Sequence, residues 1–259
     1  MNLFFYLFVF IFGLVFGSFL NCLVYRLEAK KSFLKGRSFC PRCQHLLSWR
    51  ELLPVLSFIL LRGKCRYCRK PISLQYPLVE MAAGLLFVLI VFYFSFDFLF
   101  SFFYLIFSCF LIVIFVYDLK YYIIPDRVIY PAIVLAFLYQ VIEGTGSVAR
   151  IGQYSVLSAV GAAAFFLAIV LLSRGRWMGV GDIKLAFLMG LLLGWPDILV
   201  ALFLAFFIGA VVGLGLMVSG QKGLKSEIPF GPFLVTGTFL ALFWGNELLD
   251  WYQAFFLLK

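Results

Sequence analysis

Long apolar runs separated by short polar segments fill most of the chain. The first run covers residues 3–25 and stops at Arg26, and a polar segment follows at residues 26–75. Seven further apolar runs cover residues 76–96, 99–117, 128–142, 152–172, 183–195, 197–219 and 229–256. Since about 18 or more apolar residues can cross a bilayer as one helix, the pattern predicts an all-α polytopic membrane protein with about eight transmembrane helices.

Two of these runs differ from an ordinary membrane span. Residues 3–25 lack the basic flank and the small-residue cleavage site of a signal peptide, so we expect a retained helix. Residues 183–195 rise only about 20 Å as a helix, less than the roughly 30 Å of the hydrocarbon core. Either the membrane thins there or the helix starts in a water-filled cavity. We expect the cavity, because surroundings other than lipid tolerate short helices.

Composition and charge exclude a soluble protein and orient the helices. Of the 259 residues, 64% are hydrophobic and 13% are charged, whereas soluble domains average about 25% charged residues. The segment 26–75 holds 12 of the 21 Lys and Arg residues. Cytoplasmic loops collect such residues, so we place this segment in the cytoplasm, together with the loops at 118–127, 173–184 and 220–227. Only Arg150 and Lys259 then lie outside, and the positive charge favours membrane lipid over nucleic acid as a partner.

Four cysteines in the polar segment have the spacing of a metal site. Cys40-Pro-Arg-Cys43 is followed, after 21 residues, by Cys65-Arg-Tyr-Cys68. Two such pairs can supply the four thiolates of a tetrahedral zinc site, which leaves no open position and is therefore structural. Two disulfides are the alternative, and a reducing cytoplasm disfavours them.

The other metal-ligating side chains have simpler interpretations. His45 lies between the two pairs, but a fifth ligand is unnecessary, so we interpret it as a surface residue. Cys22 and Cys109 lie within apolar runs and are interpreted as small buried hydrophobic residues.

Two aspartates at the cytoplasmic ends of apolar runs are candidate catalytic residues. Asp118 ends the third run and Asp182 starts the sixth, so the predicted topology places both at one depth on one face. A carboxylate at membrane depth is costly and marks a functional site. Two neighbouring carboxyl groups can divide their roles, one activating water while the other donates a proton. The alternative is that each is a helix cap or is paired with Lys120, Lys184 or Arg127.

The glycines that precede Asp182 suggest a second feature of this site. In Gly179-Val-Gly-Asp182 they would allow a substrate backbone to approach closely and would permit unusual backbone angles.

Short motifs extend through the whole chain in a fixed order. The N-terminal part contains Gly17-Ser-Phe-Leu-Asn-Cys-Leu-Val-Tyr-Arg26, the two Cys pairs, Pro54-Val-Leu-Ser57, Leu61-Arg-Gly-Lys-Cys65, Pro71-Ile-Ser73 and Tyr76-Pro-Leu-Val-Glu80. The C-terminal part contains Asp118, Ile124-Pro-Asp126, the Gly-x-Gly-Asp segment at 179–182, and Pro229-Phe-Gly-Pro-Phe233. Together these motifs resemble those of the bacterial prepilin peptidases, also called type IV leader peptidases.

The resemblance implies an enzyme of the bacterial inner membrane. Its members are aspartic endopeptidases of the GxGD type, and the two catalytic aspartates correspond to Asp118 and Asp182. They remove the basic leader of type IV prepilins or type II secretion pseudopilins after a Gly, with the active site facing the cytoplasm. Bifunctional members then methylate the new N-terminal residue, usually Phe, with S-adenosylmethionine as methyl donor.

Domain roles follow from the same resemblance. Residues 1–25 would be the first transmembrane helix, 26–75 a cytoplasmic module associated with methylation, and 76–259 the peptidase domain. No glycine-rich nucleotide loop follows a predicted strand, so the residues that bind S-adenosylmethionine are not identified. Leu52 replaces an Asn that many members carry, which removes a polar contact near the methylation site.

Other polar residues receive structural interpretations. Asn21, Arg26 and Glu80 lie at the ends of apolar runs, and the resemblance implies that the module docks there. Asp126 is the rival of Asp118 for the first catalytic position, and a helix N-cap explains it. The segment 229–233 is either a helix start or free backbone for an extended substrate.

Two other functions remain open from the sequence. One is a leader peptidase without methylation. The second is a transporter or assembly scaffold in which the two aspartates relay protons, although no mid-bilayer charge or related halves are seen.

Overall fold

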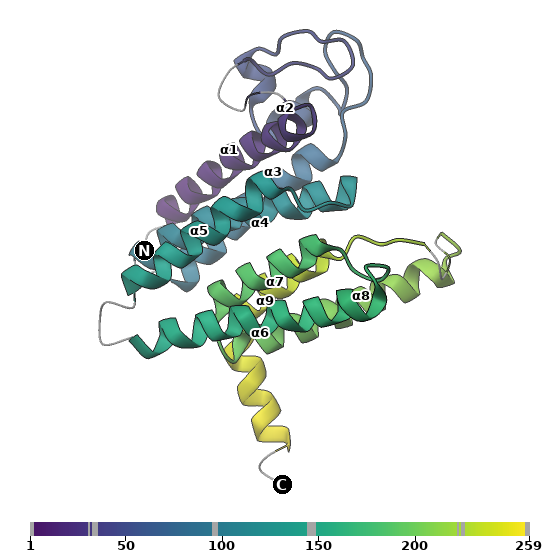
Figure 1. Ribbon diagram of the computed structural model, residues 1–259. Helices are drawn as coiled ribbons and strands as arrows, with labels where there is room; N and C mark the ends of the chain where they lie inside the picture. Colours follow the sequence, from purple (N-terminus) through teal and green to yellow (C-terminus); the bar gives the residue numbers. More distant parts are fainter. Residues whose placement is uncertain are drawn as a thin grey trace. The chain divides into compact units, whose positions relative to one another are not determined.

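The computed structural model describes residues 3–30, 32, 36–94, 98–143, 149–221, 223 and 226–256. Within these ranges the chain is helical and has no strand, only two isolated β-bridges. The long helices are α1 (Leu3–Glu28), α3 (Gln75–Tyr93), α4 (Phe98–Tyr121), α5 (Asp126–Glu143), α6 (Ala149–Ser173), α7 (Val180–Leu193), α8 (Asp197–Val218) and α9 (Gly231–Phe256) (Figure 1). The prediction of an all-α polytopic membrane protein is confirmed.

The number of spanning helices is slightly lower than expected. Six described helices are long and apolar enough to cross a membrane: α1, α3, α4, α6, α8 and α9. Helix α5 contains Asp126, Arg127 and Glu143, and α7 has only 14 residues. Length and composition therefore do not qualify these two helices as spans. Lys259, expected on the outer face, lies outside the described residues.

The chain divides into two compact units, Met1–Val113 and Ile114–Lys259. In the first unit α1 and α3 pack against each other where small residues allow a close approach. A Cβ atom on Gly17 would lie 2.6 Å from Cα of Glu80, and one on Gly13 would lie 2.7 Å from Cα of Gly84. The segment between these helices carries the short helices η1 (Trp49–Leu52) and α2 (Leu56–Leu60) (Figure 1).

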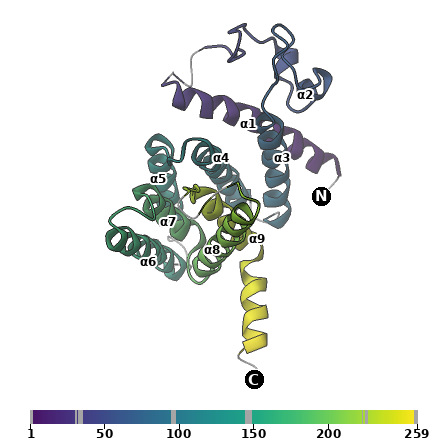
Figure 2. The same ribbon diagram turned by 90° about the vertical axis from the view of Figure 1, so that its right-hand side faces the viewer.

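Helix α7 is the central helix of the second unit. It packs against α5, α6, α8 and α9, and Figure 2 shows it next to α5 and α6. Leu185, Leu188, Met189 and Leu191 are fully buried. Protein therefore surrounds a helix that rises only about 21 Å, while its first turn borders a cavity described below. This arrangement agrees with the expected start of the short helix in a cavity.

Candidate functional site

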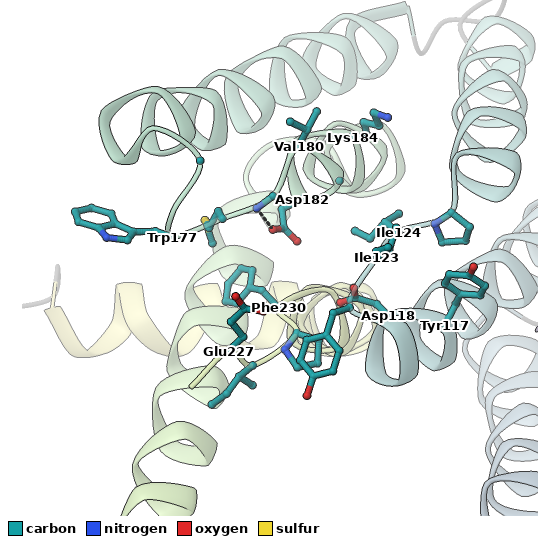
Figure 3. A pocket seen from close by; sticks show the side chains of 18 of the residues that line it. Tyr117, Asp118, Ile123, Ile124, Trp177, Val180, Asp182, Lys184, Glu227 and Phe230 are labelled. Atoms are coloured by element: carbon teal, nitrogen blue, oxygen red, sulfur yellow. Dashed lines mark hydrogen bonds between the residues drawn. The ribbon is translucent and has the colours of Figure 1, made fainter. Parts of the chain in front are cut away.

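A cavity of about 990 Å³ lies at one end of the second unit. Its wall comes from the end of α4, the following loop, the start of α7 with the residues before it, and the segment 226–230 (Figure 3). The volume is at the upper end of the roughly 300–1,000 Å³ range of small-molecule sites. Both candidate catalytic residues, Asp118 and Asp182, line this cavity.

Asp118 lies in the last turn of α4 and is only 5% exposed. Its Oδ2 accepts a hydrogen bond of 3.0 Å from the backbone N–H of Gly231, the first residue of α9. A side chain at 231 has no room, because its Cβ would lie 2.6 Å from this oxygen. The glycine therefore allows a backbone donor to reach the carboxyl group directly.

Asp182 lies in the first turn of α7 and is 8% exposed. Its Oδ2 accepts a hydrogen bond of 3.1 Å from the backbone N–H of Gly179. Burial raises the pKa of Asp182 to about 6, against the lowering effect of this hydrogen bond, and the charge of Asp118 raises it further. The electrostatic effect of Asp118 means that the two carboxyl groups are close enough to influence each other's ionisation.

The two carboxyl groups point into the same space from opposite walls of the cavity (Figure 3). Each uses Oδ2 for one backbone N–H, so the second oxygen of each can serve water or a substrate. Such a pair can hold one proton between two acidic groups, which is the arrangement required for acid–base catalysis by carboxyl groups.

The cation expected near the aspartates pairs elsewhere. Nζ of Lys184 lies 2.6 Å from Oδ1 of Asp126, and it also lies 4.9 Å from the ring centroid of Tyr130. Lys184 therefore does not pair with Asp182, so the ion-pair form of the structural alternative fails for this lysine. The helix-cap form is present for Asp182, because its carboxyl group accepts the N–H of Gly179, the N-cap residue of α7. Asp126 is 61% exposed and occupies the first turn of α5, where it forms this ion pair.

The interpretation of the glycines before Asp182 needs correction. Gly179 has an extended backbone with φ of −86°, and neither Gly179 nor Gly181 has positive φ. A Cβ on Gly181 would lie 3.1 Å from Cβ of Ile124, in the loop after α4. Gly181 thus allows α7 to pack closely against this loop, and unusual backbone angles are not the reason for the glycines.

Residues 226–230 precede α9, lie outside any helix and form one wall of the cavity. The N–H of Gly231 is used by Asp118, and the carbonyl of Phe230 accepts hydrogen bonds from the first turn of α9. The helix-start interpretation of 229–233 is therefore right for Phe230 and Gly231. The sequence did not predict the hydrogen bond from Gly231 to Asp118. The two residues are 113 positions apart, and no local sequence pattern indicates such a contact.

The four cysteines Cys40, Cys43, Cys65 and Cys68 form one cluster in the first unit. Their sulfur atoms all lie within 4.8 Å of one another, and all six cysteines of the chain are free of disulfides. A tetrahedral zinc ion with bonds of about 2.3 Å would hold the sulfurs about 3.8 Å apart, so the cluster fits such an ion. The disulfide alternative is wrong for this structure.

The two Cys pairs have the same backbone conformation. The N–H of Cys40 donates to the carbonyl of His45, and the carbonyl of Cys40 accepts from Gln44. The matching bonds join Cys65 to Lys70 and Arg69, and both Gln44 and Arg69 have positive φ, of 57° and 56°. Burial raises the pKa of the Cys40 thiol, but hydrogen bonds from the N–H groups of Cys43 and Arg42 lower it to about 7, which favours the thiolate.

His45 is exposed and lies outside the cluster, as expected for a surface residue. Its ring lies against that of Tyr67, with centroids 3.5 Å apart and the ring planes tilted by 33°, and so connects the two pairs. Cys22 and Cys109 are partly buried rather than buried, and Cys109 packs against the cluster of Val9, Phe87 and Val91.

Polar residues of α1 and α3 bind the two helices to each other and to the segment between them. Nη2 of Arg26 donates to the carbonyl of Gly36 at 2.7 Å, and Nδ2 of Asn21 donates to the carbonyl of Tyr76 at 3.1 Å. The N–H of Val55 donates to Oε2 of Glu80 at 2.7 Å. Val55 has φ of +59°, which is unusual for a β-branched residue. These contacts give the three residues the interface role that the sequence predicted.

Comparison with known proteins gives two family matches that together cover most of the chain. Residues 11–94 match the bacterial peptidase A24 N-terminal domain, and residues 105–214 match the type IV leader peptidase family. No solved structure matches significantly.

Several relatives are similar over nearly their whole length, and each is named a prepilin leader peptidase/N-methyltransferase. The relative from Aeromonas hydrophila is 31% identical over 96% of this chain and 94% of its own. Those from Bacillus subtilis and Legionella pneumophila are also 31% identical, over 94% and 98% of this chain and 96% of their own.

Proposed function

The chain belongs to the type IV leader peptidase family, and on this premise we propose that it cleaves the leader of type IV prepilins or pseudopilins and then methylates the new N-terminal residue. The relatives' names carry both activities. Two buried carboxyl groups that face one cavity support the peptidase activity, and within the part of the chain that the structure describes no cation pairs with either of them.

We propose Asp118 and Asp182 as the catalytic pair. Peptide hydrolysis adds hydroxide to the carbonyl carbon and a proton to the leaving nitrogen. The ionised carboxylate takes a proton from water as hydroxide adds to the carbonyl carbon, and the protonated partner donates one to the carbonyl oxygen. When the C–N bond breaks, the first carboxyl group passes its proton to the nitrogen, and one hydroxyl of the intermediate returns a proton to the partner. Both carboxyl groups are buried beside one cavity, which favours one shared proton over two charges, so one of the pair starts as the acid and the other as the base.

The backbone donors to this pair have a positioning role. Gly231 and Gly179 each fix one carboxyl oxygen. Side chains held in this way keep their reactive oxygens in place through the reaction, so little reorganisation is needed at the moment of proton transfer.

We assign methylation to the module at 26–75, and the peptidase reaction to residues 76–259. Cys40, Cys43, Cys65 and Cys68 would hold one zinc ion. With four protein ligands the ion would stabilise the module's fold and take no part in the chemistry. Methyl transfer moves CH₃ from the sulfonium of S-adenosylmethionine to the neutral amine that cleavage releases, so the amine must reach the module unprotonated.

The protein is a multi-pass membrane protein, and we propose the bacterial inner membrane with the cavity facing the cytoplasm. Arg176, in the loop before α7, and Lys184, near the start of α7, line the cavity, as the charge rule expects at a cytoplasmic boundary. A substrate with a basic leader before an apolar helix would be oriented by the same rule, which brings its cleavage bond to this boundary. The partners are thus pilin-like precursors of a type IV pilus or type II secretion system, with membrane lipid around the helices.

Co-expression with a prepilin tests the proposal. The mature pilin should lose its leader and gain 14 Da for each methyl group, as measured by mass spectrometry. A leader peptidase without methylation would give cleaved pilin of unmodified mass. A transporter or scaffold would leave the precursor uncut.

A further inference from the structure

The segment between α1 and α3 turns an apolar patch outward. Leu56, Ile59 and Leu60 of α2 are each more than half exposed. Positions i, i+3 and i+4 of a helix lie on one side, so these three side chains form a single patch, which we call the apolar face. Exposed apolar patches rimmed by polar residues mark surfaces that contact a protein or a membrane.

The inner side of α2 is fixed by Phe58. A Cβ atom on Gly63 would lie 3.1 Å from the Phe58 ring, and the N–H of Gly63 donates to the carbonyl of Phe58 at 2.9 Å. Phe58 therefore packs back onto the loop that follows α2. Since this contact sets the orientation of the helix, the apolar face points away from the packed side of the segment.

A hydrogen bond fixes the level of α2 along α3. The N–H of Val55, the residue before α2, donates to Oε2 of Glu80 at 2.7 Å. Helix α3 has 19 residues and rises about 28 Å, so nearly its whole length is needed to cross a hydrocarbon core of about 30 Å. Glu80 lies more than one turn after Gln75, or about 8 Å along the helix axis. The start of α2 is thus at the depth of the leaflet and not above it.

Lipid surrounds α3 at this level. Leu78 and Met81 lie before and after Glu80, and both are exposed and apolar. In a helix that spans a membrane, exposed apolar side chains face the acyl chains. The hydrogen bond from Val55 therefore ties the start of α2 to a level at which lipid is the surrounding medium.

The backbone of this stretch suits a position in lipid. The N–H of Val55 is bound by Glu80, and the N–H groups of Ser57, Ile59 and Leu61 donate to carbonyl groups within the stretch. The membrane interior offers no water to such groups, so a segment that enters it needs partners inside the protein. The left-handed Val55, with φ of +59°, directs its N–H to the carboxyl group that supplies one of them.

Cations and an indole accompany the apolar face. Arg50, Arg62 and Lys64 are exposed, and the guanidinium of Arg50 lies 5.3 Å from the ring centroid of Trp49. Glu51 is the one acidic residue in the sequence from 49 to 64, and its Oε2 is used by the capping box of η1. Trp and basic residues gather at membrane interfaces, where the basic residues meet anionic head groups.

We propose that residues 49–64 form an interfacial element in the leaflet that faces the module, with the apolar face among the acyl chains and the three cations at the phosphates of anionic phospholipids. Interfacial helices enter a leaflet by about 5–10 Å, which agrees with the depth of the Val55 hydrogen bond. The partner is the bilayer itself, and the cysteine cluster is held against its surface. The inference goes beyond the proposed activities, because it rests only on α1 and α3 spanning the membrane.

Photo-cross-linking of the full-length protein identifies what covers the apolar face. Benzoylphenylalanine in place of Leu56 is irradiated in nanodiscs of phosphatidylglycerol and phosphatidylethanolamine, with an equimolar prepilin present. Acyl-chain adducts, identified by mass spectrometry, should be about tenfold or more above those from the same probe in place of Arg42, an exposed residue between Cys40 and Cys43. Adducts mainly with prepilin, with a second copy or with another segment of the chain would overturn the proposal, as would equal lipid yields at the two positions.

A charge on the apolar face should weaken its contact with lipid. Leu60→Glu should lower the acyl-chain adducts of the Leu56 probe about fivefold or more, because a carboxylate is costly among acyl chains and is repelled by anionic head groups. Gln44→Glu is the matched control, since it also places one Glu at an exposed position of the segment, outside the apolar face. Its adduct yield should stay that of the original protein, and equal losses in the two variants would contradict the role of the face.

Lipid composition gives an independent test in case Leu60→Glu does not fold. Replacement of phosphatidylglycerol by phosphatidylcholine should lower the lipid adducts of the Leu56 probe severalfold, because the three cations lose their anionic partners. An unchanged yield would overturn the assignment of anionic lipid as the partner. Cleavage of the prepilin by the same preparations is measured in parallel, so a failure of the proposed function is distinguished from a failure of the interfacial element.

Discussion

The backbone N–H of Gly231 donates a 3.0 Å hydrogen bond to Oδ2 of Asp118, and no other residue type fits at this position without displacing that oxygen. The start of α9 thus determines where the first candidate catalytic carboxyl group lies. Positioning by a backbone donor has direct experimental consequences.

Gly231→Ala should lower kcat about 100-fold, since a misplacement of about 1 Å in a catalytic group has this effect. The added Cβ would lie 2.6 Å from Oδ2 of Asp118 and must move the carboxyl group. Single-turnover cleavage of a prepilin measures the change. Gly223→Ala is the control, because a Cβ there meets nothing within 4 Å. Equal activity of the two variants would contradict the positioning role.

Asp118→Asn and Asp182→Asn should each reduce cleavage by about 100- to 10,000-fold, because an amide can neither accept the proton of water nor donate as an acid. Gel mobility of the prepilin after timed incubation gives the rate. Asp126→Asn should stay within severalfold, since Asp126 forms an exposed ion pair with Lys184. A reversed pattern would move the first catalytic position to Asp126.

Asp182→Asn should also stabilise the protein at pH 8. The folded pKa of about 6 is above the ordinary 3.8, so the folded state favours the neutral carboxyl group and loses stability as pH rises from about 4 to 6. Two units correspond to about 3 kcal/mol at most. Asn has no charge to bury, so its variant should unfold at a higher temperature than the original protein at pH 8. The difference should vanish near pH 4, and thermal unfolding in detergent at the two pH values measures it.

Cys65→Ser should remove one bound zinc ion per chain, and it should reduce methylation more strongly than cleavage. A module of this size has too small a core to fold without its metal, whereas both aspartates lie outside it. Elemental analysis and the mass of mature pilin are the measurements. Cys22→Ser should keep the metal, because Cys22 is not in the cluster. Full methylation by a metal-free variant would contradict the module's role.

The helices and the metal cluster could be predicted because their signals are local. Apolar runs indicate helices directly, and the spacing of Cys40, Cys43, Cys65 and Cys68 indicates a four-ligand cluster. The meeting of Asp118 and Asp182 in one cavity followed from topology, since alternating helices return to the same face. Their catalytic role stays a prediction.

Contacts between distant segments could not be predicted in the same way. The pairing of Lys184 with Asp126, rather than with Asp182, depends on how α5 lies against α7. Hydropathy also overestimated the number of spanning helices. The apolar residues of α7 are buried against other helices of the protein, and α7 is not among the helices long and apolar enough to span.

The central place of α7 bears on biosynthesis. The chain is made from the N-terminus, so Asp118 and Asp182 leave the ribosome before α8 and α9 exist to surround α7 and before Gly231 can hold Asp118. A nascent chain therefore carries both aspartates without the arrangement that would make them reactive. Proteolytic competence would therefore arise only when the last helix has entered the membrane and Gly231 has reached Asp118.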